Sequence, residues 1–177
     1  MSAEFESDRL FFRSQRVEDA AALHEAYSDA ELMRYWSSAP HATVDETVAY
    51  LTPRAERPEW RGWSILLKGE ERVIGTLAAG EKRSGVSEIG YLLVREHWGR
   101  GYAREAVTRL LDLLFVEEDN RRVFADADPD NTGSNRLLEA LGFTLEGRLR
   151  GEWETHIGVR DSLIWGMLRD EWRVLSS

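Results

Sequence analysis

The stretch EIGYLLVREHWGRGYAREAVTRLLDLLF, residues 88–115, decides the fold of this chain. Ile89 to Val94 is a short apolar run of strand-forming residues. Gly99 and Gly101 then flank Arg100, which marks a tight turn. Apolar residues recur at helical spacing after the turn, at Ala103, Ala106, Val107, Leu110, Leu111 and Leu114. The stretch therefore predicts a strand, a glycine turn and an amphipathic helix in direct succession.

The glycine turn is the part of this stretch that can bind a ligand. Successive amides from Gly99 to Arg104 can point into one concavity at a helix N-terminus, where free N–H groups and the helix dipole attract phosphate. No Gly-Lys-Ser/Thr follows the turn, and no third glycine stands at the dinucleotide-binding spacing. An ATPase and a nicotinamide enzyme are therefore disfavoured. The segment alone leaves two alternatives, a different phosphate-bearing ligand or a turn that binds nothing.

Composition and charge narrow the class of protein. The chain has 177 residues, which predicts a single domain spanning 1–177, and it has no cysteine, which excludes disulfides, thiolate metal sites and cysteine nucleophiles. No apolar run approaches membrane-spanning length and the N-terminus is acidic, so we expect a cytoplasmic protein without a membrane partner. The formal net charge of −9 argues against nucleic acid and is compatible with amine-bearing substrates.

Strand and helix signals alternate along the rest of the chain. We expect strands at 10–13, 63–68, 72–79, 122–126, 143–149 and 157–167, helices at 19–27, 30–35, 44–51 and 131–142, and a short tail at 168–175. Thr43 and Glu46 predict a capping box for the third helix. This order predicts an α/β or α+β domain around a mixed sheet, in which the two strands of the 88–126 unit are parallel neighbours.

Several motifs in this order resemble the GCN5-related N-acetyltransferases, and more narrowly their Rim-type branch, which acetylates ribosomal protein N-termini. The resemblance spans nearly the whole chain. It rests on the opening DRLFFR, on Trp98-Gly-Arg-Gly-Tyr-Ala103, on Asn131-x-x-Ser-Asn135, on Glu139-x-Leu-Gly-Phe143 with Glu146-Gly147, and on Arg160-Asp-Ser-Leu-Ile-Trp165. Trp98 departs from the Gln or Arg that is usual in the broader superfamily. The resemblance implies a mixed, mostly antiparallel, twisted sheet of about seven strands, flanked by helices and splayed at its two central parallel strands.

The resemblance also implies acetyl-CoA as co-substrate. Its pyrophosphate would lie on the backbone amides of Arg100, Gly101, Tyr102, Ala103 and Arg104. Its pantetheine arm would pair like an added strand with Leu92, Leu93 and Val94. Asn131 would bind the far side of this arm, and Ser134 would lie near the sulfur atom.

Acetyl transfer from a thioester to an amine sets three chemical tasks. The departing thiolate needs a proton, and Ser134 is the predicted donor, although a serine at a helix start is often only a cap. The developing oxyanion needs a hydrogen-bond donor, and we expect the backbone N–H of Val94. The amine must lose a proton, and Glu152 is the leading predicted base, with Glu154 or water as alternatives. A solvent-exposed carboxylate without a function is the competing interpretation for both glutamates.

The acceptor amine is the least defined part of the prediction. Tyr35, Trp36 and His41 lie in the segment that covers the acceptor site in the family, and they are the predicted substrate-binding residues, with a core role as the alternative for the aromatic pair. The four histidines show no ligand spacing, so we expect no metal. The predicted activity is direct acetylation of a primary amine, either a protein N-terminus or a small molecule, by a monomer or homodimer. A non-catalytic acyl-CoA binding module is the alternative.

Overall fold

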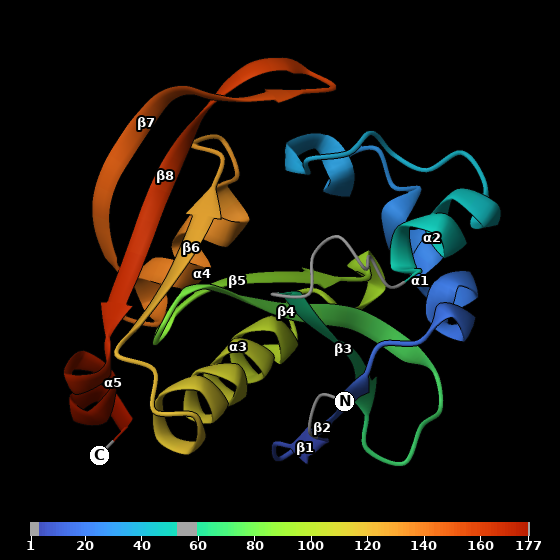
Figure 1. Cartoon of the computed structure of the whole chain (residues 1–177). Coiled ribbons are helices and arrows are strands. Elements are labelled where there is room, and N and C mark those ends of the chain that lie inside the picture. The colour runs from blue at the N-terminus through green and yellow to red at the C-terminus, as the bar shows by residue number, and fades with distance from the viewer. Residues whose placement is uncertain (1–3, 53–59, 177) are drawn as a thin grey trace.

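The computed structural model describes residues 4–52 and 60–176 and is built on one eight-stranded mixed sheet (Figure 1). The strands lie in the order β1-β2-β3-β4-β5-β6-β8-β7, and β5 and β6 are the parallel pair. The strands are β1 (Phe5–Glu6), β2 (Leu10–Ser14), β3 (Trp60–Leu67), β4 (Val73–Arg83), β5 (Val86–Leu93), β6 (Arg122–Ala127), β7 (Thr144–Thr155) and β8 (Gly158–Leu168). The helical segments are η1 (Val17–Asp19), α1 (Ala20–Tyr27), η2 (Leu32–Tyr35), α2 (Val44–Leu51), η3 (Arg95–His97), α3 (Tyr102–Asp112), η4 (Leu113–Glu117), α4 (Thr132–Ala140) and α5 (Arg169–Ser176).

The central parallel pair separates soon after it forms. β5 and β6 pair only where Val86 to Glu88 lies beside Arg122 to Phe124. Beyond this point β5 stays with β4 as far as Leu93, while β6 stays with β8 as far as Ala127. A gap therefore opens between the carboxyl ends of the two strands, which is where open α/β sheets bind ligands. The predicted splay of the central parallel strands is confirmed.

Helices cover the two faces of the sheet around two hydrophobic clusters. The larger cluster joins the sheet to α3 and α4, and Leu110 and Leu111 of α3 are completely buried in it. The smaller cluster joins α1 and α2 to the other face through Leu23, Leu51 and Leu92. The β7–β8 hairpin extends beyond the helices and arches toward η2 (Figure 1). The sheet face beside the gap is thus bordered by α1 and α2 on one side and by this hairpin on the other.

The decisive stretch folds as its pattern predicts, with one addition at its end. α3 begins after Gly101, whose φ of 79° lies in the left-handed region that favours glycine. The helix passes at Leu113 into a π-helical segment. This widened turn lets Leu113, Leu114 and Phe115 all remain buried, although a regular α-helix would spread three successive residues over about 200° of its surface.

Four details differ from the sequence predictions. The sheet has eight strands because Phe5–Glu6 adds a short edge strand to the predicted set. The final hairpin strands are longer than expected, and the expected tail is the helix α5. Thr43 caps α2 by accepting the Glu46 amide at 3.3 Å, but the Glu46 carboxylate accepts the Ala42 amide at 2.7 Å rather than that of Thr43. The predicted N-cap is confirmed. The reciprocal bond of the capping box is shifted by one residue, to the amide that precedes the cap.

Candidate active site

The turn between β5 and α3 presents a row of free backbone donors. Gly99 and Gly101 both have positive φ, at 71° and 79°. The first backbone bond of α3 runs from the Glu105 amide to the Gly101 carbonyl at 3.0 Å. Within 4–52 and 60–176, none of the amides from Gly99 to Arg104 has a hydrogen-bond partner. These donors lie at the positive end of the helix dipole, which suits an anionic ligand such as a phosphate.

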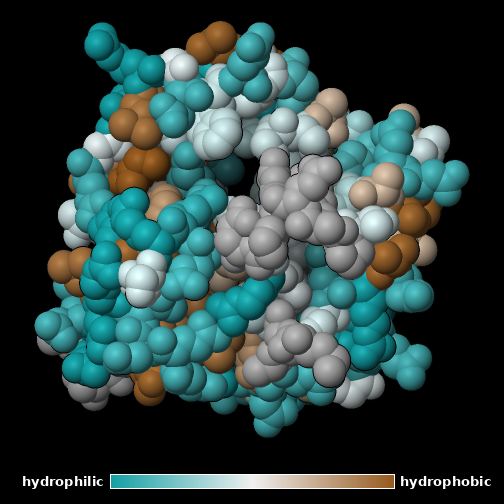
Figure 2. Space-filling model, in the orientation of Figure 1, coloured by the Kyte–Doolittle hydropathy of each residue, from teal (hydrophilic) through white to brown (hydrophobic). Residues whose placement is uncertain are grey.

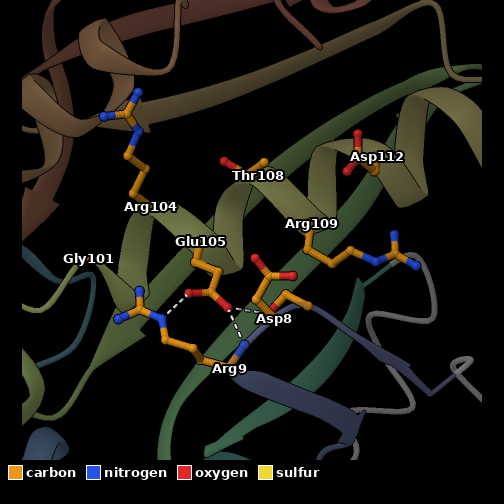
Figure 3. A pocket seen from close by; sticks show the side chains of 9 residues that line it. Asp8, Arg9, Gly101, Arg104, Glu105, Thr108, Arg109 and Asp112 are labelled. Carbon is orange, nitrogen blue, oxygen red and sulfur yellow. Dashed lines mark hydrogen bonds and ion pairs between the residues drawn. The ribbon is translucent and has the colours of Figure 1, made fainter. Parts of the chain in front are cut away.

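Two arginines beside these donors are also free to bind an anion. Arg100 and Arg104 are exposed, and neither side chain has an ion-pair partner among the described residues. Arg9 is already engaged, since its Nε donates to Glu105 at 2.7 Å and its Nη1 donates to the Arg100 carbonyl at 3.0 Å. Arg9, Arg104 and Glu105 line a groove along the outer face of α3 (Figure 3), whose volume is about 560 Å³. The turn therefore combines free amides with free guanidinium groups.

The backbone of β5 directs different groups into the gap from those predicted. The Val94 amide donates to the Ile74 carbonyl of β4 at 2.8 Å, so it is not free to stabilise an oxyanion. Backbone groups alternate in direction along an antiparallel ladder, so those of Leu92 and Val94 face β4 while those of Tyr91 and Leu93 face the gap. The prediction for the Val94 amide is therefore wrong, and the Leu93 amide is the donor that the register provides.

Trp98 confirms the direction of these groups. Its indole Nε1 donates to the Leu93 carbonyl at 2.7 Å, from the side away from β4. The Arg95 guanidinium lies 5.2 Å from the Trp98 ring centroid, and the indole remains about half exposed at 48%. A pantetheine arm that pairs with this edge of β5 must either share the Leu93 carbonyl with Trp98 or displace the indole. The residue that departs from the superfamily pattern thus contacts the edge on which the arm would pair.

The N-terminus of α4 lies across the gap and positions Ser134. Asn131 is the N-cap, because its Oδ1 accepts the Ser134 amide at 3.2 Å. The Ser134 hydroxyl is therefore not the cap of the helix. It lies 2.6 Å from the hydroxyl of Tyr91 on β5, within hydrogen-bonding distance. Burial raises the pKa of Tyr91 to about 12, although the Ser134 bond opposes that change, so the phenol stays protonated at neutral pH.

Tyr91 is not among the site residues predicted from the sequence. Its alternation with Ile89 and Leu93 places it on the face that packs against α3 and α4, and this much is readable from a strand pattern. Its distance from Ser134 depends on how α4 docks, because the two residues are 43 positions apart in the sequence.

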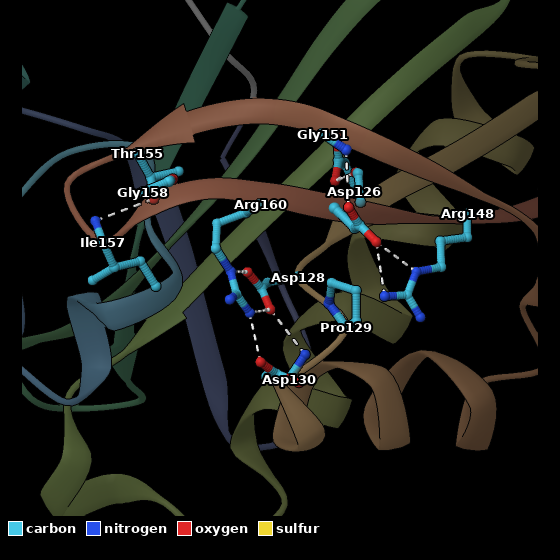
Figure 4. Close-up of polar contacts among 12 residues, drawn as sticks. Asp126, Asp128, Pro129, Asp130, Arg148, Gly151, Thr155, Ile157, Gly158 and Arg160 are labelled. Atoms are coloured by element: carbon cyan, nitrogen blue, oxygen red, sulfur yellow. Dashed lines mark hydrogen bonds and ion pairs between the residues drawn. The ribbon is translucent and has the colours of Figure 1, made fainter.

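The loop between β6 and α4 is held in place from both sides. Arg160 of β8 bonds both carboxylate oxygens of Asp128, at 2.7 and 2.8 Å, and also bonds Asp130 at 2.6 Å (Figure 4). Burial alone would raise the pKa of Asp128, but the hydrogen bonds from Arg160 outweigh it and the pKa lies below its usual value. Asn135 donates to the Asp128 carbonyl at 2.9 Å and accepts the Trp165 indole at 2.9 Å. These contacts fix the start of α4, and with it Ser134.

The predicted base lies in an irregular part of the hairpin. The register of β7 against β8 shifts between Leu149 and Trp153, and Glu152 lies within this bulge. Its side chain is exposed and has no hydrogen-bond partner in the described ranges. Its neighbour Trp153 donates its indole N–H to Asp126 of β6 at 2.9 Å. The structure therefore places Trp153, rather than Glu152, against the strands of the gap.

The three predicted acceptor residues lie in different environments. His41 is 7% exposed, stacks on Tyr27 with centroids 5.0 Å apart, and bonds Thr47 at 2.9 Å. Burial lowers the pKa of His41, so it is neutral at neutral pH. Trp36 is half-buried and donates to the Tyr50 hydroxyl at 3.2 Å, and Tyr35 is half-buried in η2. His41 thus has a packing role between α1 and α2, whereas Tyr35 and Trp36 keep surface at the border of the gap.

These features fit a CoA thioester. The free amides and Arg100 and Arg104 suit a pyrophosphate, and the edge of β5 offers the Leu93 amide to an extended chain. The hydroxyls of Tyr91 and Ser134 form a hydrogen-bonded pair beside the gap. The described residues contain no group of three His, Asp or Glu side chains that could hold a metal ion. No helix in that part of the chain is long and apolar enough to cross a membrane.

Comparison with known proteins defines the class. The family model for the acetyltransferase (GNAT) domain matches residues 9–144, and the chain belongs to this family. An uncharacterised N-acetyltransferase, p20 of Bacillus licheniformis, is 32% identical over 171 residues, which is 94% of this chain and 96% of the relative. A GNAT-family acetyltransferase from Bacillus anthracis superposes with a TM-score of 0.85 at 24% identity, covering 95% of this chain and 99% of that one.

A neighbour solved with ligands has the same fold. It is spermidine N-acetyltransferase from Vibrio cholerae in complex with CoA and spermine, with a TM-score of 0.80, 21% identity, and coverage of 94% of this chain and 99% of that one. The protein is therefore an acetyl-CoA-dependent N-acetyltransferase with the GNAT fold. The acceptor does not follow from this likeness.

Proposed function

We propose that residues 1–177 form one domain that transfers the acetyl group of acetyl-CoA directly to a primary amine, with Ser134 as the proton donor to the leaving thiolate. The observation that carries this proposal is the pair of hydroxyls of Tyr91 and Ser134, 2.6 Å apart at the gap between β5 and β6. Asn131 caps α4, so the Ser134 hydroxyl is not needed as the cap and is available to a group bound in the gap.

Acetyl-CoA supplies an activated carbonyl carbon when bound. The free amides from Arg100 to Arg104 bind its phosphates, and the Leu93 amide polarises the carbonyl oxygen. As the amine nitrogen bonds to the carbonyl carbon, the carbon–sulfur bond breaks and sulfur takes the proton of Ser134. The proton released by the amine goes to Glu152 or to solvent water. Proton return from water, along the Ser134–Tyr91 pair, restores the serine.

We propose that the acceptor is either the N-terminus of a protein, as the Rim-type motifs favour, or a small-molecule amine. The border of the gap supports both classes, because Tyr35 and Trp36 of one side and the β7–β8 hairpin of the other are separate elements that can admit a peptide or a small molecule. Acetylation of an N-terminal peptide panel and a small-amine panel, measured by thiol release, decides between them.

Replacement of Ser134 by Ala tests the assignment. We expect kcat to fall about 100-fold or more, the usual contribution of a positioned general acid, with little change in acetyl-CoA affinity. Thr132→Ala is the matched control, because it removes an exposed hydroxyl from the same helix start. Equal losses of kcat and acetyl-CoA affinity in Ser134→Ala would contradict the catalytic role. If acetyl-CoA binds but no amine increases thiol release, the chain is an acyl-CoA binding module instead.

A further inference from the structure

Asp126 lies on the face of the gap opposite to Ser134. Along β6, Val123, Ala125 and Ala127 are buried and face α3 and α4, so Asp126 points to the other side of the sheet. Ser134 and Tyr91 pack with the α3 and α4 side. A thioester held between β5 and β6 would therefore have the serine hydroxyl on one face and the Asp126 carboxylate on the other.

Neutral donors hold the Asp126 carboxylate. The Ser162 hydroxyl donates to one oxygen, and the Trp153 indole donates to the other at 2.9 Å. Four carboxylates of this region are paired with arginines: Asp128 and Asp130 with Arg160 (Figure 4), Asp161 with Arg148, and Glu146 with Arg122. Asp126 has no such cation among the described residues. It is thus an oriented anion whose countercharge is missing.

Open space lies across the gap from this carboxylate. Phe124 pairs with Glu88, and Asp126 and Gly90 each lie two residues further along their own strands, on the two sides of the gap that opens there. A Cβ built on Gly90 would have no atom within 4 Å. Figure 2 shows the surface hollowed between the end of β6 and η2. Among the described residues, no side chain therefore blocks a bound group that lies over Gly90 on this side of the gap.

We propose that Asp126 binds the ammonium group of a cationic acceptor and so selects amines that are charged at neutral pH. This inference rests on the proposed function, because it assigns the acceptor side of the same site. The bound cation supplies the countercharge that Asp126 lacks, and Ser162 and Trp153 hold the carboxylate toward it. Bound here, the acceptor lies on the face of the gap away from Ser134. Once the reacting ammonium has given its proton to Glu152 or to water, its nitrogen and the leaving sulfur lie on opposite sides of the carbonyl carbon.

The test compares Asp126→Asn with Asp161→Asn. The first substitution is isosteric: its amide oxygen can accept the Trp153 indole N–H, and its amide nitrogen can donate to the Ser162 hydroxyl. The second removes one negative charge that Arg148 already neutralises on the same hairpin. For spermidine and for a peptide with a free N-terminus, we expect Asp126→Asn to raise the amine KM about 10- to 100-fold, as loss of a charge-assisted hydrogen bond implies, with an unchanged KM for acetyl-CoA. Asp161→Asn should change neither constant more than about twofold.

A neutral acceptor and a binding measurement separate the outcomes. An aromatic amine, uncharged at neutral pH, should show the same KM in Asp126→Asn and in the natural protein. Calorimetric titration of spermidine into the CoA-loaded protein should show the same loss of affinity as the KM. An unchanged KM and unchanged calorimetric affinity for the charged amines would overturn the assignment of Asp126. Failure of the natural protein to acetylate any amine would instead contradict the proposed function.

Discussion

Replacement of Tyr91 by Phe removes a single oxygen atom at the centre of the site. That oxygen lies 2.6 Å from the Ser134 hydroxyl. A hydrogen bond of this kind contributes about 0.5–1.5 kcal/mol, and about 1.4 kcal/mol corresponds to a tenfold change in rate. We therefore expect kcat to fall about 2- to 12-fold while the KM for acetyl-CoA stays constant. Thiol release at saturating amine measures both.

A double-mutant cycle tests whether the loss acts through Ser134. If Tyr91 positions the serine hydroxyl, Tyr91→Phe should have no further effect on kcat once Ser134 is Ala. Tyr50→Phe is the control, since it removes a phenol oxygen that accepts the Trp36 indole at 3.2 Å in the second hydrophobic cluster. Its effect should combine additively with Ser134→Ala. Rate losses from Tyr91→Phe and Ser134→Ala that simply multiply would refute the reasoning.

The same substitution has a signature in alkaline solution. The folded protein holds the pKa of Tyr91 at about 12, above the ordinary value of 10. A raised pKa stabilises the fold fully below pH 10, and this contribution is lost as the pH rises through 12. The free energy of unfolding of the natural protein should therefore fall relative to that of Tyr91→Phe between pH 10 and 12. Urea unfolding across this pH range measures the difference. If the free energies of unfolding of the two proteins changed with pH in parallel, the environment described for Tyr91 would be wrong.

Two further predictions concern Gly101, in the turn before α3, and Asp29, which lies between α1 and η2. Gly101→Ala and Gly69→Ala place a side chain at φ of 79° and 82°, so each should destabilise the fold by about 1–2 kcal/mol, yet only Gly101→Ala should weaken CoA binding in calorimetry; equal CoA affinities would remove the turn from the site. Hydrogen bonds from Arg95 lower the pKa of Asp29 to about 2, so the stability that Asp29 confers is present above pH 4 and lost as the pH falls toward 2. Urea unfolding should show Asp29→Asn less stable than the natural protein at pH 7 and equal to it near pH 2, whereas a constant difference would contradict this.

Local patterns predicted the site where one segment supplies it. The amides from Gly99 to Arg104 form one turn, so the glycine spacing and the following helix were enough to place them. Asn131 and Ser134 lie within one helical turn, and the sequence alone does not decide which of the two caps the helix. The hydrogen bond from the Ser134 amide to Asn131 decides it. The Val94 amide was predicted wrongly because the direction of a backbone group depends on the register with β4 and not on its own residue. Glu152 lies in a bulge whose position a strand pattern cannot show.

By itself, the sequence determined the order of most strands and helices and the glycine turn between β5 and α3. These properties depend on periodicity and on glycine conformation, which act over a few residues. Only the tertiary structure decided that Tyr91 meets Ser134 and that Asp126 has no ion-pair partner among the described residues, because these contacts join β5 to α4 and β6 to the distant hairpin. The packing of separate elements sets such distances, and these groups all border the gap between β5 and β6.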